Sequence, residues 1–205
     1  MNMRIARDIA YFCLSVIFFW IYIPHFIAYL MSSKQNLIKN DLEELSTKLN
    51  IRLGNTLSLL FFLHNNSYFR TFFYHRIGAV WSFFISWWRP GCNNFIISKT
   101  TTIGGGVLFA HPYATIINAE SIGTNFSFRH LTTLGNKDTN NNRPIIGDNV
   151  TLGANVTIIG KITIGNNVTI GAGSIVIKSV ADNCVCAGNP ARVIRKIDKE
   201  LHRGK

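Results

Sequence analysis

Aliphatic residues recur at every sixth position through much of the second half of the chain. The most regular members of this series are Ile146, Leu152, Ile158, Ile164, Ile170 and Val176. A second aliphatic or small residue follows each of the first five after four positions, at Val150, Val156, Ile162, Val168 and Ser174. The same spacing occurs earlier and less regularly, at Ile103, Phe109 and Thr115 and again at Ile122, Phe128 and Leu134. A period of six fits neither an α-helix nor a simple alternating strand, but it is typical of a β-helix, in which each short strand forms one side of a coil.

Glycine and asparagine fill the positions between these aliphatic residues, as in "IGDNVT", "LGANVT", "IGNNVT" and "IGAGSI". Both residue types suit corners, where the backbone needs unusual φ values. In a β-helix the inward aliphatic side chain fills the core, and each rung hydrogen-bonds to the next. The pattern therefore predicts a β-helix domain over residues 95–190, followed by a basic tail at 191–205.

Residues 1–94 follow helical spacing instead and are strongly apolar. Residues 9–31 contain no Asp, Glu, Lys or Arg, and as one helix this run would reach about 34 Å, enough to cross a hydrocarbon core. Pro24 interrupts it, so three interpretations stay open: a membrane span, an anchor in the membrane plane, and a buried helix. The following segments read as helices with a broad apolar face, and Arg89-Pro90-Gly91 ends the helical part.

The chain is basic, with 21 Lys and Arg against 10 Asp and Glu and a net charge of +11. This charge is spread out without a dense basic run, which argues against nucleic acid and suits an anionic small ligand or a membrane surface. The four cysteines lack the spacing of zinc ligands and are expected to be free thiols; they are Cys13, Cys92, Cys184 and Cys186. No metal is expected.

The run "PIIGDNVTLGANVTIIGKITIGNNVTIGAGSIVIKSVADNCVCAGNPARVI" resembles the hexapeptide-repeat acyltransferases. Within them it is most similar to the serine acetyltransferase-like branch, which includes the O-acetyltransferases of bacterial surface polysaccharides. The resemblance implies a left-handed parallel β-helix, a homotrimer, and acetyl-CoA as acetyl donor in the groove between adjacent coils. The period alone indicates a β-helix; its hand and the trimer come from the resemblance.

His111, in "GGVLFAHPYATIIN", matches the position of the family's catalytic histidine. Moving an acetyl group from a thioester to an alcohol needs a base for the hydroxyl proton, and imidazole suits that role because it titrates near neutrality. The resemblance therefore implies that His111 is the general base. Without that motif, a histidine before proline would be interpreted as a surface turn residue. His130 is the second histidine on the predicted coils, and it either supports the site or lies at a solvated edge.

The chain departs from the serine acetyltransferases at two acidic positions. They carry an aspartate directly before the catalytic histidine and another further upstream, where this chain has Ala110 and Ile96. Without these acids, the ammonium group of serine would lose a charge partner. Arg143 remains as a candidate to bind a carboxylate or a sugar acid. What orients His111 is open, and Asn118, Glu120 or a backbone carbonyl are the candidates.

The cofactor-binding candidates also come from the resemblance. Ala154, Gly171 and Ala172 match the small residues past which family members thread the pantetheine arm. Lys178 and Arg192 match the basic side chains that meet the phosphates of the coenzyme.

Together these features predict an acetyl-CoA-dependent O-acetyltransferase acting on a sugar hydroxyl of a surface polysaccharide or its precursor. Such precursors are lipid-linked, so the apolar N-terminal part favours this acceptor, membrane contact, and a place at the cytoplasmic face of a bacterial inner membrane. Serine O-acetylation for cysteine biosynthesis is the alternative. Zinc carbonic anhydrase chemistry needs three histidine ligands, whereas only two histidines lie on the predicted coils. A non-catalytic scaffold anchored at a membrane would also explain the apolar helices, and this alternative predicts no binding of acetyl-CoA.

Overall fold

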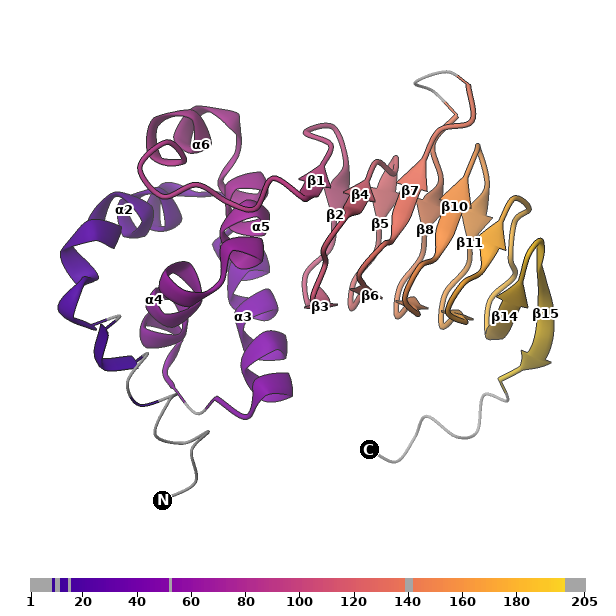
Figure 1. Cartoon of the computed structure of the whole chain (residues 1–205), viewed down its shortest axis with the longest axis horizontal. Coiled ribbons are helices and arrows are strands. Elements are labelled where there is room, and N and C mark those ends of the chain that lie inside the picture. The colour runs from indigo at the N-terminus through magenta and orange to yellow at the C-terminus, as the bar shows by residue number, and fades with distance from the viewer. Residues whose placement is uncertain (1–8, 10–11, 15, 52, 139–141, 198–205) are drawn as a thin grey trace. The chain divides into compact units, whose positions relative to one another are not determined.

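The computed structural model describes residues 9, 12–14, 16–51, 53–138 and 142–197. The chain divides into two compact units, Met1–Asn93 and Asn94–Lys205. Helices build the first unit and strands build the second (Figure 1).

The second unit is a parallel β-helix, as predicted. Its strands form three sheets that run the length of the stack: sheet A in the order β1-β4-β7-β10-β13, sheet B in the order β11-β8-β5-β2, and sheet C in the order β15-β14-β12-β9-β6-β3. Successive coils contribute one strand to each sheet (Figure 1), so the described part of the stack has about five turns. Pairing is parallel throughout except between β14 and β15. This arrangement is consistent with the left-handed β-helix that the resemblance implies.

The strands have these bounds: β1 Phe95–Ile97, β2 Thr102–Ile103, β3 Leu108–Ala110, β4 Thr115–Ile117, β5 Ser121–Ile122, β6 Ser127–Arg129, β7 Thr133–Gly135, β8 Ile145–Ile146, β9 Thr151–Leu152, β10 Thr157–Ile159, β11 Thr163–Ile164, β12 Thr169–Ile170, β13 Ile175–Val176, β14 Cys184–Gly188 and β15 Ala191–Lys196. Residues 191–196, assigned from the sequence to the basic tail, thus form a strand that pairs with β14. The last part of that tail, 198–205, lies outside the described residues.

The core of the β-helix consists of the residues that carry the six-residue period. The six most regular positions are each at most 2% exposed: Ile146, Leu152, Ile158, Ile164, Ile170 and Val176. In the first coils, Phe95, Phe109 and Phe128 pack together with ring centroids 5.8–5.9 Å apart. These larger rings fill the part of the stack where the period is less regular.

The corners confirm the expected role of asparagine. Asn125, Asn149, Asn155 and Asn167 all have φ values between 55° and 57°, in the left-handed region that asparagine tolerates better than most residues. Three of them, with Asn183, form a ladder in which each side-chain amide donates to the carbonyl oxygen of the next, at 2.9–3.0 Å. The ladder ties neighbouring coils together at one corner.

The first unit contains six helical elements among its described residues: η1 Phe19–Tyr22, α2 Ile23–Met31, α3 Gln35–Leu49, α4 Asn55–Asn65, α5 Ser67–Ile77 and α6 Ala79–Ile85. Pro24 lies in the first turn of α2, where its missing N–H costs nothing. The Asn66 side chain caps α5 by accepting a hydrogen bond from the Phe69 backbone N–H at 3.0 Å.

The apolar run at 9–31 is not one long helix, because η1 interrupts it before α2 begins. Among the described residues, no helix combines the length and hydropathy that a bilayer crossing requires; positions 10, 11 and 15 of the run lie outside them. One side of α2 is buried, through His25 and Ala28. Its other side, with Ile23, Ile27, Leu30 and Met31, is exposed.

A buried ion pair lies in the core of the helical unit. The Arg76 guanidinium donates to both carboxylate oxygens of Asp41, at 2.9 and 3.2 Å, and each side chain is at most 2% exposed. The same guanidinium lies over the ring of Phe72, 4.7 Å from its centroid. Two further hydrogen bonds join tyrosine and histidine side chains: Tyr22 to the half-buried His64 at 3.2 Å, and the buried His25 to Tyr74 at 3.0 Å.

Candidate active site

His111 directly follows β3, at the corner where the chain passes from sheet C to sheet A. Its φ value of 49° is uncommon for a residue other than glycine, although histidine reaches this region more often than most. The backbone N–H of Tyr113 donates to the His111 carbonyl at 2.6 Å, which closes a tight turn around the buried Pro112. The imidazole is exposed, and it has no hydrogen-bond or ion-pair partner within the described part of the chain. A tight turn therefore presents an accessible imidazole.

His130 lies one coil further along at the equivalent corner. β3 and β6 pair with Ala110 opposite Arg129, so His111 and His130 are the first residues of the same corner on adjacent rungs. The turn at His111 is longer, and Tyr113 accepts there the hydrogen bond from Leu131 that His130 accepts from Asn155. The carbonyl of His130 accepts a hydrogen bond from the Asn155 N–H at 3.0 Å, and the side chain is half-buried. The structure thus brings the two candidate histidines to the same edge of the stack.

The small residues proposed to line the cofactor site continue the same edge. Ala154 is in register with His130, because Ser127 pairs with Thr151. Ala172 is in register with Ala154, because Thr151 pairs with Thr169. We call the corner of the stack that carries His111, His130, Ala154 and Ala172 the histidine corner. Its last two rungs carry only the small side chains of Ala154 and Ala172, so a narrow ligand could lie close to the backbone there.

The backbone approaches closely beside this corner. A Cβ atom built on Gly153 would lie 2.5 Å from the Ala172 backbone nitrogen, and one built on Gly171 would lie 3.0 Å from the Ala187 Cβ. Larger side chains at Gly153 would therefore force adjacent rungs apart. Gly171 sits next to Ala172 and belongs to the same edge.

The two basic cofactor candidates occupy different places. Arg192 lies on β15 opposite Ala187, whose Cβ is close to Gly171, so it belongs to sheet C at the end of the histidine corner. Lys178 is exposed and follows β13 on sheet A, which places it on another side of the coil. Within one chain, the structure brings Arg192 but not Lys178 towards the small residues.

The candidates for acceptor binding and orientation lie at the corner between sheets A and B. Asn118 donates to the Asn136 side-chain oxygen at 3.3 Å, and Arg143 donates to the Thr100 hydroxyl at 2.7 Å. Glu120 is exposed and precedes β5. This corner and His111 lie at opposite ends of β4, a strand about 10 Å long. A single chain therefore does not bring these three residues to His111.

The structure adds Arg129 to the candidates. It is exposed at the end of β6, opposite Ala110 and directly before His130. The sequence could have indicated it, because Arg129 directly precedes His130 at the end of a predicted strand. In the structure it lies opposite Ala110, the position at which serine acetyltransferases carry an aspartate. No cluster of three or more His, Cys, Asp or Glu side chains that could hold a metal ion occurs among the residues that the structure describes.

Comparison with known proteins confirms the resemblance read from the sequence. Residues 143–178 match the family model described as bacterial transferase hexapeptide (six repeats). Over 99 residues the chain is 48% identical to WcaB of Escherichia coli K12, named as a colanic acid biosynthesis acetyltransferase, which covers 47% of this chain and 61% of WcaB. Over 107 residues it is 40% identical to serine acetyltransferase 2 of Arabidopsis thaliana, which covers 51% of this chain and 33% of that protein. The chain thus spans less than two thirds of these relatives.

Solved structures give the same picture. The serine acetyltransferase of Neisseria gonorrhoeae superposes with a TM-score of 0.68 at 27% identity, over 83% of this chain and 69% of that one. The same enzyme in complex with serine superposes with a TM-score of 0.64 at 27% identity, over 77% of this chain and 68% of that one. The fold is therefore shared with serine acetyltransferases, and the sequence is similar to acetyltransferases named for colanic acid biosynthesis and for serine.

Proposed function

We propose that the protein is an acetyl-CoA-dependent O-acetyltransferase with His111 as general base. The observation that carries this proposal is the histidine corner, where an accessible imidazole on a tight turn lies at the same corner of the stack as the small residues Ala154 and Ala172. The similarity to WcaB and to serine acetyltransferases supports the same reaction class. The function is tested by following release of free CoA thiol with purified protein.

The proposed reaction needs no covalent enzyme intermediate. His111 accepts the proton of the acceptor hydroxyl while its oxygen attacks the thioester carbonyl. The tetrahedral oxyanion collapses, the carbon–sulfur bond breaks, and the imidazolium returns the proton to the departing thiolate. The products are an O-acetyl ester and CoA, and the histidine is regenerated. A backbone N–H facing the oxyanion would stabilise it.

Acetyl-CoA is proposed to lie along the histidine corner, with its pantetheine arm beside Ala154, Gly171 and Ala172. Arg192 and Lys178 would bind its phosphates. We further propose a homotrimer, since Asn118, Glu120, Arg143 and Lys178 lie on other sides of the coil and a neighbouring copy could bring them to His111. Arg143 and His130 would then contact the acceptor.

The proposed acceptor is a sugar hydroxyl of a surface polysaccharide or its lipid-linked precursor, met at the cytoplasmic face of a membrane. The similarity to WcaB supports it, as does Ala110, which occupies the position of an aspartate in serine acetyltransferases. Ile96 occupies the second acidic position and points outward from β1, more than half exposed. An apolar side chain there gives no charge partner to an ammonium group.

Serine is the second candidate acceptor, because a similar structure contains it. Turnover of acetyl-CoA should be compared with serine and with sugar nucleotides or isolated polysaccharide repeat units. Rapid serine acetylation that depends on His111 would overturn the sugar assignment while keeping the reaction class.

The first prediction concerns His111 itself. We expect His111→Ala to lower kcat by about 10²–10⁴-fold, the usual contribution of a general base, with little change in acetyl-CoA affinity. Thr163→Ala is the matched control, because Thr163 is exposed on sheet B, which does not border the histidine corner. Wild-type turnover by the His111→Ala variant would contradict the proposed mechanism.

A further inference from the structure

Helix α6 and the turn that follows it carry an apolar stripe that is exposed. Its members are spaced at i, i+3, i+4, i+7 and i+8, the spacing of a single helical face. They are between 49% and 75% exposed: Val80, Phe83, Phe84, Trp87 and Trp88. In most helices of folded domains such a stripe would be buried. Here the stripe is exposed, and no element that the structure describes covers it.

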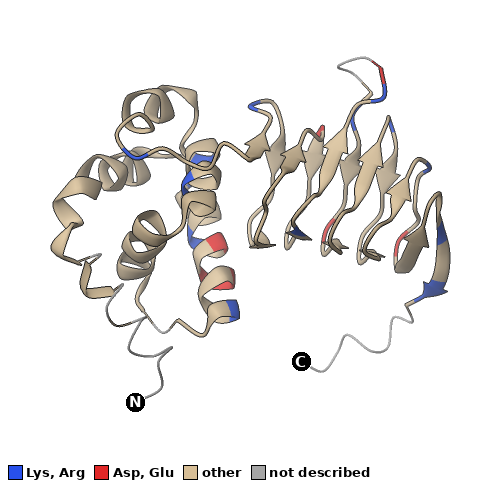
Figure 2. Ribbon diagram, in the orientation of Figure 1, with Lys and Arg blue, Asp and Glu red and all other residues tan. Residues whose placement is uncertain are grey.

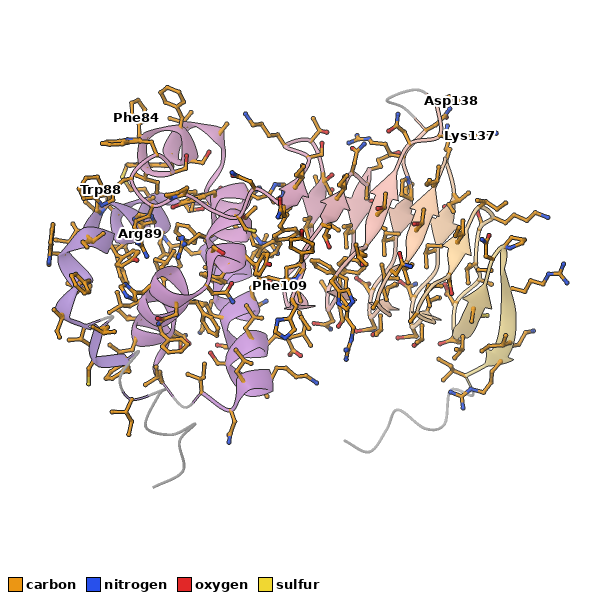
Figure 3. The ribbon with its side chains drawn as sticks, in the orientation of Figure 1. Phe84, Trp88, Arg89, Phe109, Lys137 and Asp138 are labelled. Atoms are coloured by element: carbon orange, nitrogen blue, oxygen red, sulfur yellow. The ribbon has the colours of Figure 1, made fainter. Side chains whose placement is uncertain are left out.

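A second exposed stripe runs along η1 and α2, which contacts α6. Its members are between 45% and 67% exposed: Trp20, Ile23, Ile27, Leu30 and Met31. We call these two stripes together the aromatic face. Contiguous exposed apolar surface of this extent on a monomer marks an interaction site. Figure 3 shows Phe84 and Trp88 at the edge of the unit, with Arg89 further inward.

The charges around the aromatic face have one sign. Residues 9–34 and 77–89 contain no Asp or Glu, and their two charged residues are Lys34 and Arg89. Figure 2 shows no acidic residue on α2 or α6; the acidic residues of the unit that the structure describes, Asp41, Glu43 and Glu44, all lie on α3. Lys34 is exposed shortly after α2, so a basic residue ends that stripe. Arg89 points inward instead, where its guanidinium donates to the His64 carbonyl at 3.2 Å and lies over the Tyr22 ring.

We propose that the aromatic face docks in the plane of an anionic phospholipid bilayer. Tryptophan and phenylalanine are well suited to the interface between headgroups and acyl chains, and α2 and α6 are short helices that would lie on the membrane without crossing it. Lys34 would face anionic headgroups. A second copy of the same face fits less well, because an isologous contact would place Lys34 of both copies at the contact, and the face has no acidic residue to pair with it.

This inference deepens the proposed function, because it names the surface through which the enzyme would meet a lipid-linked acceptor. Vesicle binding is measured without acetyl transfer, however. Either proposal can therefore fail while the other stands.

The test is co-flotation of the full chain with vesicles of phosphatidylglycerol and phosphatidylethanolamine. We expect binding by the wild type and a loss of about tenfold or more in the partition coefficient for Phe83→Ser/Trp87→Ser, which removes two large apolar side chains from the interface. Leu49→Ser/Leu57→Ser is the matched control, since both leucines are exposed on the same unit outside the aromatic face. This control should bind like the wild type.

The electrostatic part has its own readout. Lys34→Gln should weaken binding by about fivefold on the anionic vesicles and leave weak binding to phosphatidylcholine vesicles unchanged. No vesicle binding by the wild type would overturn the proposal. So would equal loss in both serine variants. A wild type that stays off vesicles but has a larger mass by light scattering than Phe83→Ser/Trp87→Ser would assign the face to a second copy instead.

Discussion

The two units of this chain hold together by different kinds of contact. In the β-helix, a residue's partner lies one coil away, so the same contact recurs: Asn149 bonds Asn167, 18 residues on, as Asn167 bonds Asn183, 16 residues on. In the helical unit, Asp41 meets Arg76, 35 residues away, and no other pair repeats that contact among the described residues. A repeated contact leaves a period in the sequence, whereas a single long-range contact leaves none.

The largest stability effect is expected where a unique contact is broken. Arg76→Met leaves the Asp41 carboxylate buried without its charge partner, so the free energy of unfolding of the helical unit should fall by about 3–5 kcal/mol. All four tryptophans lie in this unit, at 20, 81, 87 and 88, so tryptophan fluorescence during urea unfolding reports on it selectively. The double variant Asp41→Leu/Arg76→Met should recover most of the loss. Equal losses in the single and double variants would mean that packing, and not charge, holds this site.

A repeated contact is tested at Gly147. A Cβ atom there would lie 2.9 Å from the Gly165 carbonyl carbon and 2.6 Å from the Asn166 side-chain oxygen. Gly147→Ala should therefore destabilise the β-helix by about 1–3 kcal/mol, measured by the β-sheet signal in circular dichroism. Gly135→Ala is the control, because nothing lies within 4 Å of its Cβ position. If the coils are truly equivalent, Gly123→Ala should resemble Gly147→Ala; a much smaller effect would weaken the comparison between the units.

The helical unit should also respond to pH through a buried histidine. Burial, with the nearby Arg70 and Arg89, lowers the pKa of His25 to about 4. The unfolded chain then binds more protons than the folded one between about pH 6.5 and pH 4, so the stability contribution is present above that window and lost as the pH falls through it. Unfolding free energy should drop by about 2 kcal/mol between pH 7.5 and pH 5.

His25→Gln provides the control for this titration, because glutamine can still bond to Tyr74 but does not titrate. Tryptophan fluorescence should then give a flatter pH dependence. Burial and Arg89 also lower the pKa of His64, so a smaller slope of the same sign should persist. If the pH dependence of the unfolding free energy is unchanged in His25→Gln, groups other than His25 cause it.

The smallest effect is expected from one rung of the asparagine ladder. Asn149→Gly keeps a residue that tolerates the φ of 56° but loses two side-chain hydrogen bonds, so we expect a loss of about 1 kcal/mol. Asn149→Ala should lose more, because alanine is strained in that region. Hydrogen exchange of the neighbouring amides measures both. Equal effects of the two substitutions would show that the side-chain hydrogen bonds of Asn149, and not its backbone conformation, determine the stability of this corner.

The same contrast explains what the sequence could predict. The inward positions of the β-helix and its asparagine corners followed from the period, and the structure confirms them. Ile162 is an exception: it keeps the spacing but is only half-buried, because it adjoins the delayed glycine at Gly160. The helical unit was predicted as helices with a broad apolar face, but no local signal could pair Asp41 with Arg76 or turn the stripe of α6 outward.

The candidate site was predictable to a similar, partial extent. The resemblance named His111, and a six-residue period implies a column, but the register that aligns His130, Ala154 and Ala172 came only from strand pairing. The corner that holds Asn118 and Arg143 could not be distinguished from that of His111, because neither the length of each turn nor the way copies assemble is encoded in the spacing.

The final hairpin has a consequence for solubility. A parallel stack of coils ends in unpaired backbone groups, and such an edge invites another chain to add on, coil after coil, into a filament. In sheet C, β15 turns back antiparallel on β14, so the last parallel strand is already occupied. Its own outer edge carries Arg192, Arg195 and Lys196, all exposed, so two such ends repel one another. The antiparallel direction and the positive charge of β15 thus oppose the addition of a further coil to sheet C.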